Sequence, residues 1–480
     1  MRKGSVTLFS LLSMTLVMSA LLAMLEAARF HEIKRFSQLQ TQVALESTFA
    51  EYNTHLWEEY RLLACKQSEL ATDIQTYGDG KILGWEDGTN FYQSRVENVA
   101  VNGYTRLTDG DGKAFIQAAT GYMEDNLLYE TVQLIYSQYE SMESILGESE
   151  FDFLDIEEAL KKLEEESSSG GSTGTEGTTD DSTYEEEDYQ GENNPLLIIQ
   201  TLQEAGILAL VVKDMEDLSE SQIDTSELVS HRDLPEGFHP DIEEADWYDR
   251  VLFQQYLLTY LSSYTDEKDH VFCYEVEYLI GGKSTEIENM KAVVTQLLGM
   301  RAASNFLYLL SSPVKVEQAR LLAIAIAGAS LSPALIGIVK NAVLIAWAFA
   351  ESVLDIRTLL TGGKIALIKS DTSWTLGLDF ITTIGEGYSK AKESDFGLGY
   401  EGYLGILLLL QEESVLAKRC MDMQEVTMRE LYGSEDIYME DWIINADVEV
   451  SYKYNPVFFG VDSVLPHWKY EIVTQKKFGY

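Results

Sequence analysis

The segment Gly281-Gly282-Lys283-Ser284 is the closest approach in this chain to a nucleotide-binding loop. A phosphate-binding loop of the GxxxxGK[ST] type follows a strand, precedes a helix and cradles phosphate with backbone N–H groups. The residues before this segment favour a strand at 270–280, and those after it favour a helix. However, the glycine required five residues before Gly282 is Glu277, whose carboxylate would repel a phosphate. The sequence therefore argues against nucleotide binding.

Two carboxylates share one face of an apolar segment that the sequence predicts to be helical. Glu351 and Asp355 are one helical turn apart, so they could raise each other's pKa or share a cation. Paired acids of this kind can be catalytic. Acids on a core helix more often meet basic side chains, and Arg357, Lys340 and Arg301 are available. We predict a buried ion network containing Glu351, Asp355 and Arg357, with an acid–base enzyme as the alternative.

Metal-binding and nucleophilic motifs are weak in this chain. The six histidines form no HExxH motif and no i,i+4 pair. HPDIE at 239–243 is a weak candidate for a surface metal site. DGDG at 109–112 lacks the later ligands of a calcium loop and predicts a turn before a helix. No CxxC pair occurs among Cys65, Cys273 and Cys420. We expect no catalytic residue, no metal site and no cofactor, and calcium has only weak support as a ligand.

The composition limits the classes of partner. The 480 residues include 79 acidic and 35 basic side chains, which give a formal net charge of −44. Such a surface repels the phosphates of nucleic acids, so we expect no nucleic-acid partner. The hydrophobic fraction of 45% and the 7 prolines are typical of a folded, helix-rich protein. We predict a mainly α fold with small β elements.

The first 28 residues predict a membrane anchor. Residues 6–25 carry no charge, and a helix of this length spans about 30 Å, the thickness of the hydrocarbon core of a bilayer. A cleaved secretory signal is the alternative, but it has a shorter apolar core and a small-x-small cleavage site, whereas this run ends in MLEAAR. We expect an uncleaved single-pass anchor in the cell membrane, with a cytoplasmic N-terminus and an extracellular C-terminal domain. The basic residues on its two sides nearly balance, so they do not fix this orientation.

The anchor helix is expected to continue beyond the membrane. Apolar residues recur at spacings of three and four from Ile33 to Leu63, and no glycine or proline interrupts 5–77. We therefore predict a long amphipathic helix, which belongs to a region at 29–163 that also holds a hairpin turning at Asn102-Gly103 and a helix from Lys113 to about Leu163.

The remaining chain divides into an acidic linker at 164–194 and a helical head at 195–480. The linker is rich in Glu, Ser, Gly and Thr, so we expect it to be disordered. In the head, the sequence predicts helices at about 195–218, 244–263 and 400–432. A further helix begins at a capping box of Thr285 and Glu288 and ends at about Ser311, the next begins at Pro313, and another ends before Gly362-Gly363. The segments DVEVSYKY and KYEIVTQKKF predict terminal strands. The charge-free run at 321–339 could be a second span, but its proline and glycines favour two buried helices that flank a turn.

Several motifs carry a family resemblance. The opening RKGSVTLFSLL…LLEAAR resembles the basic leader, glycine and apolar helix of pseudopilin-like proteins of the tight-adherence (Tad) pilus system. The segments EYNTHLWEEYRLL, YEVEYLIGGKSTEIEN, AWAFAESVLDIRTLLTGGKIAL and YEGYLGILLLLQEE…KRCMDM resemble an uncharacterised domain family of Gram-positive anaerobes. These resemblances imply a membrane-tethered surface protein with pilus or pseudopilin subunits as partners. They also imply processing between Gly4 and Ser5, although the glutamate of pilins at the fifth mature position is Phe9 here.

Together these observations predict a non-enzymatic, single-pass cell-envelope protein. Its expected role is that of an accessory or pseudopilin-like component of a Tad-type surface pilus or secretion system. The alternative is a tethered extracellular module that binds a ligand or a cation.

Overall fold

The computed structural model divides the chain into two compact units, each with its own core. It describes residues 2–79, 92, 94–124, 126–148, 158–163, 194–327, 333–383, 387–433, 437–458 and 470–480. Unit 1 comprises Met1–Asp125, Arg232–Asp249 and Gln424–Tyr480, and unit 2 comprises Asn126–His231 and Arg250–Met423. The predicted regions follow one another along the chain, whereas unit 1 combines three separate segments, because strands that are distant in sequence pair within it.

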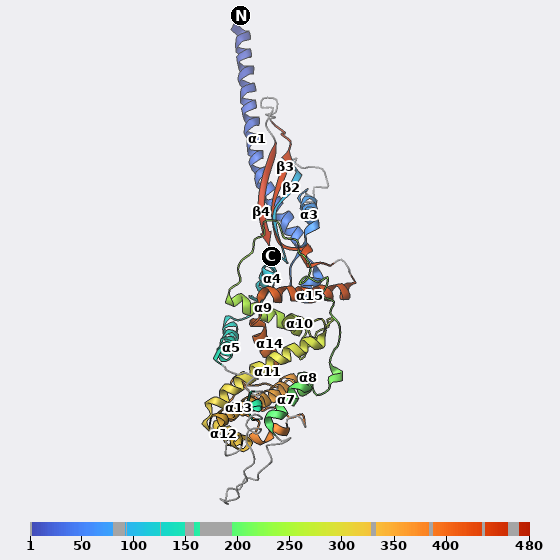
Figure 1. Cartoon of the computed structure of the whole chain (residues 1–480). Helices are drawn as coiled ribbons and strands as arrows, with labels where there is room; N and C mark the ends of the chain where they lie inside the picture. Colours follow the sequence, from blue (N-terminus) through green and yellow to red (C-terminus); the bar gives the residue numbers. More distant parts are fainter. Residues whose placement is uncertain are drawn as a thin grey trace, which may run out of the picture. The chain divides into compact units, whose positions relative to one another are not determined.

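The first helix of unit 1, α1 (Arg2–Phe49), has two halves in different surroundings. Its apolar N-terminal half is largely exposed, with Phe9 at 72% and Leu16 at 70%. In its C-terminal half, one face is buried, and Ile33 and Phe49 are at most 1% exposed. Figure 1 shows the first half extending beyond the sheet and the second half running along it. One helix therefore combines a bare apolar segment with a docked segment.

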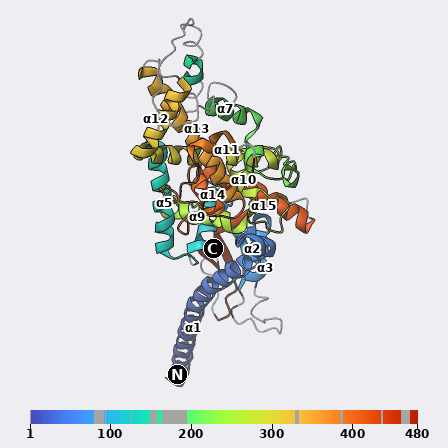
Figure 2. The ribbon, with the colours of Figure 1, turned by 90° about the horizontal axis from the view of Figure 1, so that it is seen from below.

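The predicted long N-terminal helix is present, but it ends at Phe49, so the apolar stripe predicted from Ile33 to Leu63 does not lie on a single helix. The chain turns, and α2 (Thr54–Tyr60) begins after Asn53, whose side chain accepts hydrogen bonds from two backbone N–H groups of its first turn. α3 (Leu70–Gly78) then packs against α1, as Figures 1 and 2 both show. Folding back buries apolar residues of α3 that a straight helix would leave in water.

Four antiparallel strands form the sheet of unit 1. The central strand β3 (Trp442–Tyr454) pairs with β2 (Ser94–Arg106) along one edge. Along its other edge it pairs with β4 (Glu471–Gly479) and with the short β1 (Cys65–Lys66). The two predicted C-terminal strands are thus confirmed. Helix α1 covers one face of the sheet, where its buried residues meet alternate residues of β3 and β4.

The predicted hairpin at Asn102-Gly103 is wrong, because both residues lie inside the single strand β2. The register shifts between Val101 and Gly103, so the glycine marks a bulge rather than a turn. The backbone of Phe238 crosses here: its carbonyl accepts a 2.7 Å hydrogen bond from Tyr104 N–H and would lie 3.1 Å from a Cβ at Gly103. A side chain here would press on this backbone, which favours glycine, and the local sequence does not reveal this contact.

Helix α13 (Pro333–Leu360) forms a large part of the core of unit 2. It packs against α11 (Glu286–Ser311) and α12 (Pro313–Ala327), and residues 342–360 are all buried. α13 is long and apolar enough to cross a membrane, but 61% of its most apolar window is buried within the protein. The core of a folded domain is sufficient to explain its apolar composition.

Shorter helices complete both units. α4 (Lys113–Glu124) belongs to unit 1, whereas α9 (Trp247–Tyr260) and α15 (Glu413–Tyr432) contribute residues to both. The others lie in unit 2: α5 (Tyr129–Glu148), α7 (Pro195–Ala205), α8 (Ile207–Val211), α10 (Glu275–Gly281) and α14 (Tyr400–Leu409). The predicted mainly α fold with small β elements is confirmed.

Several predicted boundaries hold and others do not. The capping box at Thr285, the helix start at Pro313 and the end of α13 before Gly362-Gly363 are confirmed. The strand predicted at 270–280 is wrong, because α10 occupies most of it. Three predicted long helices are interrupted: 113–163, 195–218 and 400–432. The acidic linker, apart from Asn194, and the predicted break at 328–332 lie outside the described residues.

Candidate functional site

Glu351 and Asp355 lie in the middle of α13, where both side chains are fully buried. Glu351 accepts hydrogen bonds from the backbone N–H groups of Thr375 (3.0 Å) and Leu376 (2.7 Å) and forms an ion pair with Lys369. The carboxylate thus holds the loop that follows α13 against the helix. Its two oxygens are engaged by the protein itself.

Asp355 contacts two basic side chains. Its Oδ2 accepts hydrogen bonds from Arg301 Nε at 3.1 Å and Asn305 Nδ2 at 3.0 Å, and Lys369 Nζ lies 2.6 Å from its Oδ1. Burial alone would raise the pKa of Asp355, but the charges of Lys369 and Arg301 outweigh it and lower the pKa. Two acids and two bases therefore balance within one buried cluster, which we call the α13 ion network: Glu351, Asp355, Arg301 and Lys369.

The third predicted member, Arg357, lies outside the α13 ion network. Its guanidinium donates to the backbone carbonyls of Leu210 (2.7 Å), Gly387 (3.0 Å) and Ser389 (3.3 Å). Of the predicted basic partners, Arg301 is present, whereas Lys369 was missed because it lies in a loop after the helix. Both carboxylates are fully buried and engaged by the protein, so the network ties loops to α13.

The loop of Gly281-Gly282-Lys283-Ser284 connects two helices rather than a strand and a helix. Gly282 adopts a left-handed conformation (φ 60°) at the end of α10, and its N–H donates to Tyr278 O at 2.8 Å. The N–H of Lys283 donates to Asn289 Oδ1 at 2.7 Å. Two of the backbone donors that would face a phosphate are therefore already used by the fold.

Ser230, His231 and Asp422 bring together the residue types of a hydrolase triad, and no motif in the sequence predicts this cluster. The Ser230 hydroxyl donates to Asp422 Oδ2 at 2.5 Å and lies 2.8 Å from His231 Nδ1. In a triad the histidine stands between the nucleophile and the acid, whereas here the serine occupies that place. Asp422 also accepts hydrogen bonds from Ser230 N–H and the Tyr278 hydroxyl. The cluster therefore holds a loop in place.

The metal and thiol candidates also lack the necessary geometry. Among the described residues, no group of three His, Cys, Asp or Glu side chains is placed to hold a metal ion. The HPDIE segment uses Asp241 in an ion pair with Lys477. All three cysteines are free. Burial raises the pKa of Cys65 to about 12 and that of Cys273 to about 11, so neither is a reactive thiolate near neutral pH.

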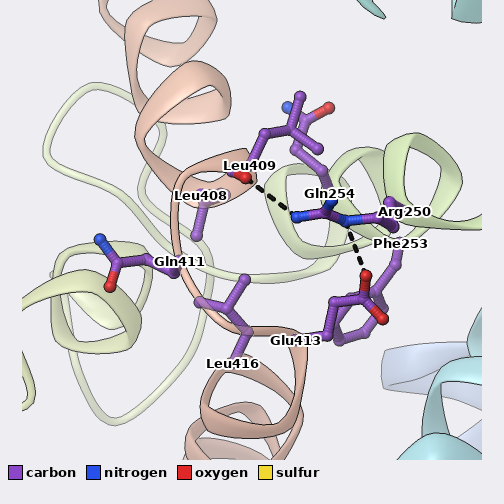
Figure 3. Close-up of a pocket in the computed structure, with 8 residues that line it drawn as sticks. All are labelled: Arg250, Phe253, Gln254, Leu408, Leu409, Gln411, Glu413 and Leu416. Carbon is purple, nitrogen blue, oxygen red and sulfur yellow. Dashed lines mark hydrogen bonds and ion pairs between the residues drawn. The ribbon is translucent and has the colours of Figure 1, made fainter. Parts of the chain in front are cut away.

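A small hollow lies between α9 and the connection from α14 to α15 (Figure 3). Arg250 lines it and pairs with Glu413 at 2.6 Å, while also donating to Leu409 O at 3.2 Å. Its free volume of about 10 Å³ has room for about one water molecule. This hollow is far smaller than a pocket for an organic ligand.

The exposed half of α1 is the remaining candidate surface. Four of its hydroxyl groups are satisfied within the helix: Ser10, Ser13, Thr15 and Ser19 each donate to a carbonyl three residues earlier, at 2.9–3.1 Å. The helix is long and apolar enough to cross a membrane, as an anchor or a signal sequence does. Gly4 and Ser5, the predicted processing site, lie in its first turns.

Comparison with known proteins gives one family. A family of unknown function (DUF5702) matches residues 185–454, which is more than half of the chain. No curated protein and no solved structure matches the sequence or the fold. The matched segment contains α13 with its ion network, most of unit 2 and strand β3. The chain therefore belongs to the DUF5702 family of unknown function.

Proposed function

We propose that this chain is a non-enzymatic, single-pass cell-envelope protein whose acidic C-terminal region lies outside the cell. The two-part character of α1 carries this proposal, because the same helix is bare and apolar at one end and docked on a folded sheet at the other. Ten Leu, Val and Phe side chains at 6–25 favour insertion by about 3 to 6 kcal/mol in total. Because the hydroxyl groups of the segment bond to its own carbonyls, they subtract little from this value.

The charge of the chain supports an N-terminus inside and a head outside. A net charge of −44 would place a large acidic body against the anionic inner surface of a cell membrane if the head were cytoplasmic. Long domains also translocate largely regardless of the charges that flank the span. An outer location avoids the repulsion.

We further propose an accessory or pseudopilin-like role in a Tad-type surface pilus or secretion system. This rests on the resemblance of the N-terminus and on the geometry of α1. An apolar helical segment that spans a bilayer can also pack against equivalent segments of other subunits, while its docked half carries the head. The acid excess supports the second candidate, a tethered module that binds a cation or a cationic ligand.

Leu16→Arg tests the anchor, with Leu39→Arg as its matched control. Leu16 is 70% exposed in the apolar half of α1, and Leu39 is 58% exposed in the docked half. An arginine at the centre of a span costs about 3 kcal/mol, which is comparable to the whole insertion free energy. We expect the first variant to appear in the carbonate-soluble fraction and the second to stay in the membrane. Equal retention of both variants would contradict the anchor.

The pilus role has its own tests. We expect the intact mass of the mature chain to correspond to a start at Ser5, and crosslinking in cells to recover pilus subunits with it. An unprocessed chain that crosslinks to no pilus subunit would leave the anchor intact but remove the pilus role. Calcium binding to the purified full chain with one site would then favour the tethered module.

A further inference from the structure

The structure places a group of aromatic and apolar side chains beside the point where the apolar half of α1 ends. The group belongs to unit 1 and comprises Phe30, Tyr92, Tyr454, Val457, Phe458 and Tyr470, which we call the interfacial collar. Phe30 lies 5.7 Å from Tyr454, and Tyr454 lies 5.6 Å from Tyr470, as measured between ring centroids. Phe30, Tyr92 and Tyr470 are partly buried around Ile33 of α1.

Hydrogen bonds fix the height of the collar along α1. Glu26, the first charged residue after the apolar run, accepts backbone hydrogen bonds from Val457 (3.3 Å) and Phe458 (2.9 Å). Arg29 donates to the carbonyl of Tyr92 at 2.5 Å. Two segments that are distant from α1 in sequence are thus held within about one helical turn of Leu25, because each helical residue rises 1.5 Å.

The charges at this level are neutralised. Arg29 and Glu26 form an ion pair at 2.7 Å, and Arg29 is only 3% exposed. The region at 26–36 contains three basic and two acidic residues, so it lacks the large acid excess of the whole chain. A region without acid excess, with exposed Val457 (46%) and aromatic rings beside it, has the composition that favours the zone between hydrocarbon and water.

We propose that the interfacial collar rests in the head-group zone of the membrane and holds the sheet of unit 1 directly against the bilayer. This inference rests on the proposed anchor, because the collar reaches that zone only if the apolar half of α1 spans the bilayer. The ion pair of Glu26 and Arg29 lets the helix leave the hydrocarbon without exposing an unpaired charge. The partner of the interfacial collar is therefore a lipid surface, and α1 runs from the span to the sheet as one continuous helix.

Spin labels at three positions of the full chain test this proposal in vesicles of phosphatidylethanolamine and phosphatidylglycerol. Cys273→Ala removes the partly exposed thiol, whereas Cys65 and Cys420 are buried. A label at Val457→Cys is compared with Leu16→Cys in the span and with Leu39→Cys, an exposed position about 20 Å further along α1 than Glu26. The measured quantity is the ratio of collision rates with oxygen and with a water-soluble nickel chelate.

We expect the ratio at Val457 to be severalfold higher than at Leu39 and lower than at Leu16. If Val457 matched Leu39 while Leu16 stayed lipid-exposed, the collar would be wrong and the anchor would stand. If Leu16 itself were open to the chelate, both proposals would fail. Spin–spin broadening at Val457 without protection by lipid would indicate a second copy as its partner and would also overturn the collar.

Discussion

Glu277→Gln should change how the stability of the protein depends on pH. Glu277 is fully buried in α10, where it accepts hydrogen bonds from the N–H of Tyr264 at 3.0 Å and from the hydroxyl of Tyr400 at 2.8 Å. Its second oxygen has no hydrogen-bond partner among the described residues. Burial raises the pKa of Glu277 from 4.5 to about 7, and the nearby Glu286 adds to this, although the two hydrogen bonds act against it.

The sign and the size follow from this difference. Between pH 4.5 and about 7 the folded state binds a proton that the unfolded state has released, so this group makes stability fall as the pH rises. Each pH unit of difference corresponds to about 1.4 kcal/mol, which gives about 3 kcal/mol between the two values. Glutamine cannot ionise, so the variant should lack this loss. Any constant cost of its amide group is the same at both ends of the range.

Urea unfolding of the full chain in detergent micelles at pH 5 and pH 8 measures the effect. The free energy of unfolding of the wild type should decline more than that of Glu277→Gln, by up to about 3 kcal/mol. Glu401→Gln, which changes an exposed glutamate in the first turn of α14, is the control and should follow the wild type. Parallel curves for the wild type and Glu277→Gln would refute the reasoning, because they would mean that this carboxyl titrates alike in both states.

Other residues give further predictions. Asp355→Asn should destabilise the protein by about 3 to 5 kcal/mol in urea unfolding, since it leaves buried bases without their acid. Because the folded pKa is lowered, this contribution is present above about pH 4 and is lost as the pH falls, so the variant and the wild type should converge in acid. Lys315→Gln should cost about 0.5 to 2 kcal/mol in the same assay, because Lys315 Nζ lies 4.7 Å from the ring of Trp374 and 4.9 Å from that of Trp347. Thr285→Ala should remove the cap of α11 at a cost of about 1 kcal/mol and speed amide exchange in its first turn, and unchanged exchange would contradict the capping role.

The sequence was sufficient to locate helix ends that carry a capping residue or a residue that stops the helix. The capping box at Thr285, Pro313 and the glycine pair after α13 each satisfy or stop a helix within a few residues. The predictions at these positions are confirmed. Asn53 is a signal of the same kind, and it could have located the end of the first helix, because its side chain caps α2.

Elements decided by distant contacts could not be found in this way. The segment of α10 has the aromatic and β-branched composition of a strand, but its two glutamates reach Ser262 and Tyr264 from a helix. Gly103 follows an asparagine as in a hairpin turn, yet the backbone of Phe238 crosses there. Three of the four members of the α13 ion network could be named from the sequence, because Arg301 and the two acids lie on predicted helices, whereas Lys369 lies in a loop.

Several acidic side chains of unit 2 hold its loops in place through hydrogen bonds to backbone N–H groups. Five buried carboxylates accept hydrogen bonds from backbone N–H groups of loops that lie elsewhere in the sequence: Glu275, Glu277, Glu286, Glu351 and Asp422. A carboxylate that accepts backbone N–H groups holds a loop in one conformation without a disulfide, and the three cysteines of this chain are all free. Part of the acid excess is therefore structural. In this chain, these buried acids therefore serve as loop anchors, and both oxygens of Glu351 accept backbone N–H groups.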